Sequence, residues 1–268
     1  MHLSRPARVA LRLFVAVGLA FVYLPLLVVV IESFNPARVS SWPPDGFTTN
    51  WWGRAWDNPG ARAAVWTSVK AALGATVIAL LLGTSLSFAV QRHRFFGRDT
   101  LSLLVVLPIA LPGIVTGIAL QSSFRFLGVP LSLWTIVAGH ATFCIVVVFN
   151  NVVARLRRVS RSLEEASADL GADAWQTFRF VTFPQLKTAL LAGGLLAFAL
   201  SFDEVIVTTF TAGQQWTLPI WMLTELVRPR QRPVTNVVAV FVILVTLAPI
   251  LLAFYLTRDT HEVAGSGK

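Results

Sequence analysis

Residues 155–186 read RLRRVSRSLEEASADLGADAWQTFRFVTFPQL, a polar stretch between two long apolar ones at residues 131–154 and 188–211. Each apolar neighbour is long enough to cross about 30 Å of hydrocarbon as a helix, which takes about 20 residues. The polar stretch is therefore predicted to be a loop at one membrane face, between two spans of a protein that crosses the membrane several times.

The composition of the chain also indicates a membrane protein. Of its 268 residues, 55% are hydrophobic and only 13% are charged, which is about half the charged fraction of a soluble domain. A soluble enzyme, a disordered chain, a collagen and a coiled coil are therefore excluded. The net charge of +9 fits basic loops at a cytoplasmic face better than nucleic-acid binding, so no nucleic-acid partner is expected.

Six apolar stretches are long enough to span a membrane. They lie near residues 13–31, 69–90, 101–124, 131–154, 188–211 and 235–256. The first could be a signal peptide, but its apolar run is longer than such a peptide needs and no small-residue cleavage site follows Ile31. In the third, Pro108 and Pro112 predict a bend. We expect an all-α integral membrane protein with six transmembrane helices and a single transmembrane domain over residues 1–268.

The basic residues predict the orientation of the chain. With the N-terminus in the cytoplasm, fourteen of the 22 Lys and Arg residues fall on the cytoplasmic side and eight fall on the other. Loops that stay in the cytoplasm carry such an excess. Both termini and the loop over residues 155–187 are therefore expected in the cytoplasm.

Local signals predict a first short helix in this loop. Ser162-x-x-Glu165 has the pattern of a capping box and predicts a helix from Leu163, and Gly171 suits the positive φ that ends a helix. The apolar side of this helix consists of Leu163, Ala166 and Leu170. The helix could lie on lipid, but its carboxylates fit an anionic membrane surface poorly. A protein partner is the favoured interpretation.

A second short helix should follow. Asp173 is placed to cap it, and the helix is expected to expose Trp175 and Phe178 before Pro184 ends it. The loop then consists of a helix, a glycine turn and another helix.

The spacing of the loop residues resembles that of a known family. The residues are Glu165-Ala166-Ser167, then Gly171, then Val181-Thr182-Phe183-Pro184. Permease subunits of binding-protein-dependent ABC importers share the pattern Glu-Ala-Ala, three residues, Gly, nine residues, Ile-x-Leu-Pro (the EAA motif). This resemblance implies the type I ABC importer permease fold in a bacterial inner membrane. It also implies that the loop is a coupling segment that contacts the ATPase. The residues of the loop assigned to this contact are Leu163, Glu165, Ala166, Leu170, Gly171 and Pro184.

The resemblance further implies an assembly of several chains. Its members are a second permease subunit, two cytoplasmic ATPase subunits and a periplasmic solute-binding protein, with membrane lipid around them. The chain has no Gly-x-x-x-x-Gly-Lys-Ser/Thr loop, no nucleophile with a recognisable base and no Cys/His/Asp cluster with metal spacing. We therefore expect no catalytic, metal or cofactor site here, and ATP and Mg on the partner ATPase.

Residues 201–207, SFDEVIV, followed by Thr217-Leu218-Pro219, resemble the spermidine/putrescine (PotC-like) branch of that family. This resemblance implies a polyamine cargo and a PotB-like second permease subunit. Many members of the branch place an acid after the second proline of the third span, where this chain has Gly113. An amino-acid-like or opine-type cargo therefore remains an alternative.

Asp203 and Glu204 are carboxylates that fall well inside an expected span, where an unpaired acid costs at least about 2.5 kcal/mol. With Thr208 they are assigned to the substrate pathway, because a dehydrated ammonium group needs a charge partner. A structural acid pair is the alternative. An ion-coupled secondary transporter using these acids would predict internal repeats, which the sequence lacks. His140 is expected to be a buried hydrogen-bonding group.

Overall fold

The computed structural model describes residues 4–38, 43–228 and 233–245, and every regular element within these ranges is a helix. The expected all-α class is therefore confirmed. The contacts divide the chain into two units, Arg62–Trp221 and the pair of segments Met1–Ala61 and Met222–Lys268. Each unit is described by itself.

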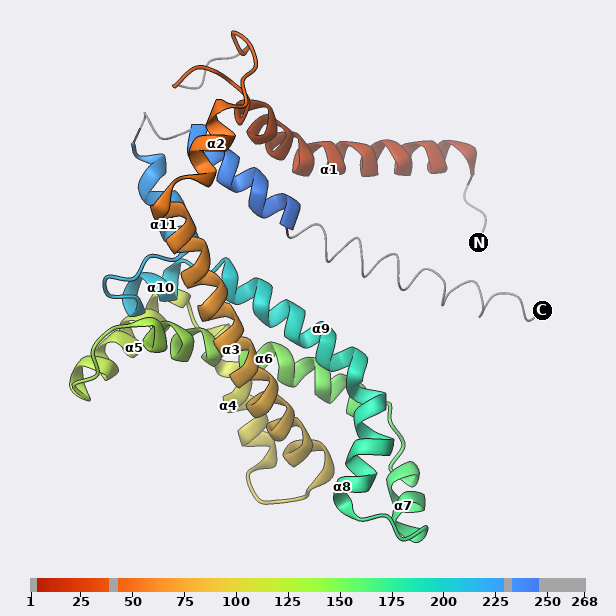
Figure 1. Ribbon diagram of the computed structural model, residues 1–268. Helices are drawn as coiled ribbons and strands as arrows, with labels where there is room; N and C mark the ends of the chain where they lie inside the picture. Colours follow the sequence, from red (N-terminus) through yellow and green to blue (C-terminus); the bar gives the residue numbers. More distant parts are fainter. Residues whose placement is uncertain (1–3, 39–42, 229–232, 246–268) are drawn as a thin grey trace. The chain divides into compact units, whose positions relative to one another are not determined.

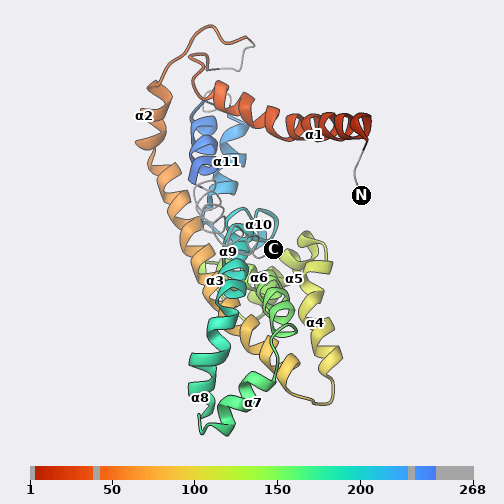
Figure 2. The same ribbon diagram turned by 90° about the vertical axis from the view of Figure 1, so that its right-hand side faces the viewer.

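The larger unit, Arg62–Trp221, holds the loop and the acids that the sequence singled out. Its helices are α3 (Pro59–Arg92, from Arg62 onward), α4 (Arg98–Ala110), α5 (Gly113–Phe126), α6 (Leu133–Leu156), α7 (Ser162–Asp169), α8 (Ala174–Thr177), the π-helix η1 (Phe178–Thr182), α9 (Phe183–Phe202), α10 (Ile206–Thr211) and the first part of α11 (Leu218–Leu226). Figures 1 and 2 place α7 and α8 at one end of this unit, beyond the ends of α6 and α9.

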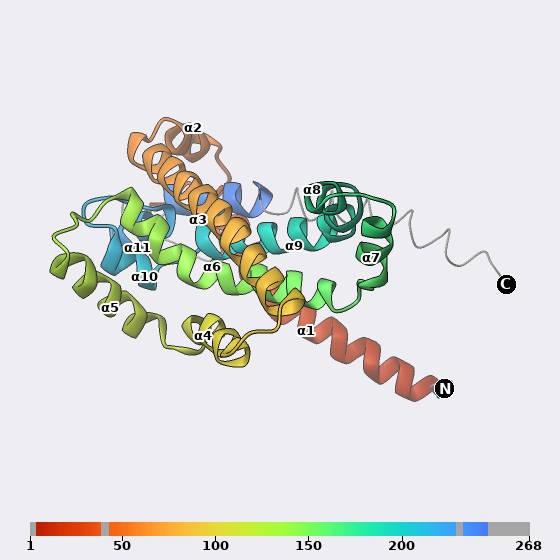
Figure 3. The same ribbon diagram turned by 90° about the horizontal axis from the view of Figure 1, so that it is seen from below.

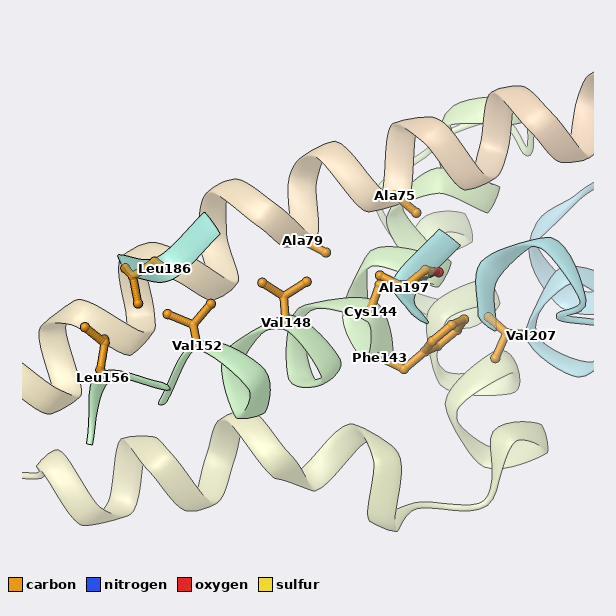
Figure 4. Close-up of a cluster of buried hydrophobic side chains, with 10 residues drawn as sticks. All are labelled: Ala75, Ala79, Phe143, Cys144, Val148, Val152, Leu156, Leu186, Ala197 and Val207. Atoms are coloured by element: carbon orange, nitrogen blue, oxygen red, sulfur yellow. Dashed lines mark hydrogen bonds between the residues drawn. The ribbon is translucent and has the colours of Figure 1, made fainter. Parts of the chain in front are cut away.

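The core of this unit lies between α3, α6 and α9, and α6 is its most buried long helix. The cluster drawn in Figure 4 consists of Ala75, Ala79, Phe143, Cys144, Val148, Val152, Leu156, Leu186, Ala197 and Val207. A Cβ added to Gly83 of α3 would lie 2.9 Å from the carbonyl oxygen of Ile145 in α6. Small residues thus let these helices approach closely, as is common inside membranes.

The four helices that are long and apolar enough to cross a membrane, among the described residues, are Arg5–Glu32, Pro59–Arg92, Leu133–Leu156 and Ala174–Phe202. A fifth span results if α4 and α5 are taken together. For the sixth expected span, the structure describes a 13-residue apolar helix, Pro233–Val245. The remainder of that stretch lies outside the described residues.

The third expected span consists of two helices that meet at a sharp corner, instead of one bent helix. α4 and α5 meet at 104°, and Figure 3 shows the corner between them. Leu111 is extended, with φ −82° and ψ 144°, and Pro112 follows it at the start of α5. A proline disfavours helical geometry in the residue before it, which explains the corner. Pro108, in contrast, lies inside α4.

The fifth expected span, residues 188–211, is not one continuous helix. α9 ends at Phe202, Asp203 is its C-terminal cap, and α10 begins at Ile206. Asp203 and Glu204 therefore lie in a break between two helices, which is a correction to the expectation that they lie within a helix. The contacts that stabilise this break come from distant parts of the chain and are described below.

The second unit contains α1 (Arg5–Glu32), α2 (Asn50–Trp56) and the helix Pro233–Val245. Ser4 caps α1, because its hydroxyl accepts a hydrogen bond from the Ala7 amide at 3.4 Å. After α1 the chain is fixed by aromatic side chains: the Trp51 indole donates to the Asn35 carbonyl at 2.9 Å, and Phe34 stacks on Trp52 at 5.3 Å.

Candidate functional site

The first candidate site is the loop between α6 and α9, which begins with α7. The Ser162–Glu165 capping box does not form, so that prediction was wrong. Arg161 is the N-cap and has helical backbone angles, and the Ser162 hydroxyl lies 2.7 Å from that of Ser160. Because the helix begins at Ser162 itself, this side chain lies one residue too late to act as the cap.

The end of α7 is as the sequence predicts. Gly171 has φ +84°, and its amide donates to the Ala168 carbonyl at 2.9 Å. The next amide, of Ala172, donates to the Ser167 carbonyl at 3.1 Å. These two bonds form a Schellman motif, which requires the left-handed conformation at the glycine.

The start of α8 is also as predicted. The Asp173 carboxylate accepts from the Gln176 amide at 2.8 Å, and the Gln176 side chain accepts from the Asp173 amide at 2.9 Å. Pro184, however, does not end this helix, and that prediction was wrong. α8, η1 and α9 follow one another without a break, and Pro184 lies in the first turn of α9. A proline is tolerated there, after the wider π-helical turn, because it removes no hydrogen bond from a helix interior.

One side of α7 is attached to the helices beside it. The Glu164 carboxylate forms an ion pair with Arg92 of α3 at 2.8 Å and accepts a hydrogen bond from the Thr182 hydroxyl of η1 at 3.3 Å. The Arg161 guanidinium donates to the Gln91 carbonyl at 2.6 Å. The sequence analysis missed Glu164 and Arg92, since nothing local distinguishes Glu164 from Glu165 and the two partners are 72 residues apart.

The other side of α7 is exposed and contacts no helix among the residues that the structure describes. The residues assigned to the ATPase contact are all exposed: Leu163, Glu165, Ala166, Leu170, Gly171 and Pro184. Leu170 is 89% exposed and Trp175 of α8 is 64% exposed. Phe178 differs from its expectation, because it is half-buried with its ring centroid 5.9 Å from that of Phe88. The loop therefore presents exposed apolar residues together with the exposed carboxylates of Glu165, Asp169 and Asp173, as expected of a protein-docking surface.

The second candidate site is the break between α9 and α10. Asp203 is exposed, and its carboxylate has no hydrogen-bond or ion-pair partner among the residues that the structure describes. Glu204 is half-buried, and its carboxylate accepts from the Val207 amide at 2.9 Å, which caps the start of α10. Thr208 is fully buried and donates to the Glu204 carbonyl at 2.7 Å. Of the three residues assigned to the pathway, Asp203 is thus the one whose carboxylate is exposed and unpaired among the described residues.

His140 of α6 lies against this break. Its Nδ1 is 2.7 Å from the Ser201 hydroxyl at the end of α9, and its Nε2 is 2.7 Å from the Thr208 hydroxyl in α10. The side chain is 1% exposed. The expectation of a buried hydrogen-bonding histidine is confirmed, and the structure adds the partners.

α10 packs between α5 and α6, where glycines make room for it. A Cβ added to Gly117 of α5 would lie 2.5 Å from the Phe210 ring, and one added to Gly139 of α6 would lie 3.1 Å from Val207. Such close approach requires residues without side chains. Helices α5 and α6 therefore hold α10, the helix that follows the break, on two sides.

The two candidate sites are suited to binding and to conformational movement. Among the described residues no group of three or more His, Cys, Asp or Glu side chains could hold a metal ion. The loop can bind a protein, and the Asp203 carboxylate can bind a cation.

Comparison with known proteins finds a matching family and several similar chains. Residues 75–261 match the family described as "Binding-protein-dependent transport system inner membrane component". The chain is 31% identical to the spermidine/putrescine transport system permease protein PotC of Haemophilus influenzae, over 93% of this chain and 96% of that protein. It is 33% identical to the putrescine transport system permease protein PotI of Escherichia coli K12, over 84% of this chain and 83% of that one.

Solved structures give the same fold. A bacterial ABC transporter involved in import of the polysaccharide alginate matches with a TM-score of 0.73 and 15% identity, over 97% of this chain and 99% of that one. An amino acid ABC transporter matches with a TM-score of 0.60 and 17% identity, over 79% of this chain and all of that one. At these identities the likeness concerns the fold alone.

Proposed function

Because the chain belongs to the family of binding-protein-dependent transport system inner membrane components, we propose that it is the permease subunit of an ATP-driven importer whose cargo is a polyamine. The observation that supports a polyamine as the cargo is the similarity to PotC over 93% of this chain. The similarity to PotI, named for putrescine, supports the same cargo class. An ion-coupled secondary transporter is not favoured.

The permease works as one member of an assembly. Its partners are a second permease subunit of the PotB type, two ATPase subunits and a solute-binding protein, with ATP and Mg bound by the ATPases. The chain lies in a bacterial inner membrane as a multi-pass protein with both termini in the cytoplasm. The excess of basic residues on that side supports this orientation.

The exposed side of α7 is the docking surface for an ATPase subunit. Its apolar residues Leu163, Ala166 and Leu170 enter a groove on the ATPase, and Glu165 pairs with a polar group there. When nucleotide binding moves this groove, α7 moves with it. The Arg92–Glu164 ion pair carries the motion to α3, and η1 carries it to α9. Such a contact drives transport only if the two conformations of the permease hold α7 differently.

The Asp203 carboxylate is the charge that meets the cargo. Putrescine and spermidine carry ammonium groups, which lose water as they enter the membrane and need an anionic partner. Asp203 supports this role because it is exposed and unpaired among the described residues. Glu204 and Thr208 support the pathway indirectly, since both hold the start of α10.

Uptake by the complete transporter in proteoliposomes tests this proposal. The binding protein, both permeases and the ATPases are reconstituted, and uptake of radiolabelled putrescine is measured with ATP inside. Asp203→Asn is compared with the neighbouring Glu204→Gln as its control. Labelled 2-aminoethylphosphonate and an amino acid serve as competing cargoes, since PhnV of Salmonella typhi, a permease protein named for 2-aminoethylphosphonate transport, is 29% identical over 75% of this chain.

The expected result is putrescine uptake by the wild type and a loss of about tenfold for Asp203→Asn, because one charge partner of a dehydrated ammonium is removed. ATPase activity stimulated by the loaded binding protein should fall less. Glu204→Gln should retain most uptake, because an amide oxygen can still accept from the Val207 amide. Uptake of the phosphonate or the amino acid in place of putrescine would contradict the polyamine assignment.

A further inference from the structure

The break between α9 and α10 is bridged by one side chain from another helix. Ser201 and Thr208 bind the two nitrogens of His140. Along the chain, Ser201 precedes Asp203 and Glu204, and Thr208 follows them. Both hydroxyl residues are buried, with 2% and 0% exposure. The imidazole therefore connects the end of one half-helix to the start of the next.

For the neutral ring, one tautomer fits the hydroxyl contacts on both sides. The Thr208 hydroxyl donates its one proton to the Glu204 carbonyl, so it accepts from His140, and Nε2 carries a hydrogen. Nδ1 is then an acceptor, and the Ser201 hydroxyl donates to it. In this arrangement all three side chains are satisfied, which a buried polar group requires. The rigid ring fixes the separation of the two hydroxyls.

The other hydrogen bonds at the break join residues that are close in sequence: Glu204 accepts from Val207 and Thr208, and the Val205 carbonyl accepts from Thr209. The Asp203 amide donates to the Ala199 carbonyl at 3.2 Å, and the Glu204 amide to the Ser201 carbonyl at 3.5 Å, which is long for a hydrogen bond. The far end of α10 is held separately, because the Thr135 hydroxyl of α6 donates to the Thr211 carbonyl at 2.7 Å. α6 thus holds α10 at both ends, and His140 also joins α10 to α9.

We propose that His140 is a positioning residue: by bridging Ser201 and Thr208 it sets where the break presents the Asp203 carboxylate. Asp203 has no side-chain partner of its own among the described residues, so its place follows from the backbone on either side. The consequence for transport rests on the proposed function, whereas the geometric consequence does not.

The first experiment measures the place of residue 203 directly. Asp203→Cys is made with Cys144→Ala, which removes the chain's one native cysteine, and its reaction rate with a cationic methanethiosulfonate reagent is recorded in the assembled complex. The rate is compared between His140 and His140→Phe, whose ring has similar size but forms no hydrogen bond. Ser123→Cys, exposed on α5, is the control for general loosening.

His140→Phe should change the reaction rate of the cysteine at position 203 about fivefold or more, because each buried hydroxyl loses a partner. The rate of the cysteine at position 123 should not change. His140→Asn, which can reach Ser201, and His140→Gln, which can reach Thr208, should each restore only part of the wild-type rate. An unchanged rate at position 203 in His140→Phe would contradict the proposed positioning role of His140. Full restoration of the rate by His140→Asn alone or by His140→Gln alone would also contradict it.

The second experiment measures transport by the chain that retains Asp203. Putrescine uptake per assembled complex should fall about fivefold in His140→Phe, with assembly unchanged. A role confined to stability predicts the reverse, namely less assembled complex and an unchanged rate per complex. If the wild type transports no putrescine, the proposed cargo fails, and the reaction rate of the cysteine at position 203 still decides the role of His140.

Discussion

The Arg92 guanidinium, in the last turn of α3, lies 2.8 Å from the Glu164 carboxylate in the first turn of α7. Both side chains are largely shielded from solvent, with 13% and 24% exposure. The Thr182 hydroxyl of η1 binds the same carboxylate oxygen. One acid therefore joins α7 to α3 and to η1, which continues into α9, while its neighbour Glu165 stays exposed.

Breaking this pair should uncouple the permease. Arg92→Gln leaves a partly buried carboxylate without its charge partner, at a cost of about 1–3 kcal/mol, so α7 should move without α3. ATP hydrolysis should continue while putrescine transported per ATP falls several-fold, measured in proteoliposomes.

Reversal of both charges, Arg92→Glu with Glu164→Arg, should recover part of the coupling that Arg92→Gln loses. Arg125, in the last turn of α5, is exposed and forms no ion pair among the described residues. Arg125→Gln is therefore the control and should transport normally. Equal losses in Arg92→Gln and Arg125→Gln would contradict the role of the pair.

Gly171 should not tolerate a β-branched residue. Its φ of +84° costs a residue with a side chain about 1–2 kcal/mol, although a Cβ would meet nothing within 4 Å. Gly171→Val should keep the protein inserted but weaken the turn between α7 and α8, so transported cargo per ATP falls. Gly171→Asn should be tolerated better, since asparagine adopts this conformation more readily.

Gly18→Val is the matched control for that substitution. Gly18 also has open space around its Cβ position, and its φ lies outside the positive range. It should therefore behave as wild type. Normal coupling by Gly171→Val would mean that the turn is not needed.

A cysteine at Ala166 should crosslink to the ATPase subunit. Ala166 is exposed on the free side of α7, whereas Ser167 is half-buried with its hydroxyl 3.1 Å from that of Thr177. Ser167→Cys is therefore the control and should react weakly. The native Cys144 is buried, so its background reaction is small. Yields are read on gels with a short maleimide crosslinker, with and without ATP.

The yield at Ala166→Cys should change when ATP is added, because the docking groove moves. Reaction of this cysteine with lipid-linked probes alone would favour a helix that lies on the membrane surface. Equal yields at residues 166 and 167 would mean that α7 has no preferred docking side.

Local signals account for the features that the sequence predicted correctly. Gly171 requires a positive φ and Asp173 has a capping partner three residues later, so nearby residues alone determine both turns. The apolar stretches likewise predicted helices. Ser162 failed as a cap because the preceding residue, Arg161, is already in helical geometry.

Distant contacts explain what the sequence did not predict. The break at Asp203 is held by His140, which is 61 residues from Ser201 in the chain. No local pattern indicates this pairing, because an apolar stretch with two acids can also be read as one helix. The same holds for Arg92 and Glu164. Residue types alone thus located the candidate sites but not their partners.

The packing of α10 against α5 gives a last prediction. A Cβ on Gly117 would lie 2.5 Å from Phe210 Cδ2, closer than two non-bonded carbon atoms can pack, so Gly117→Ala must displace the ring or separate the helices. Overpacking of this kind costs about 1–3 kcal/mol. The melting temperature of the detergent-solubilised complex should fall. Gly113→Ala is the control, because its Cβ would meet Ile206 at an ordinary 3.5 Å. Adding Phe210→Leu should restore the stability of Gly117→Ala. If Gly117→Ala and Gly113→Ala melt alike, α10 does not depend on this close contact.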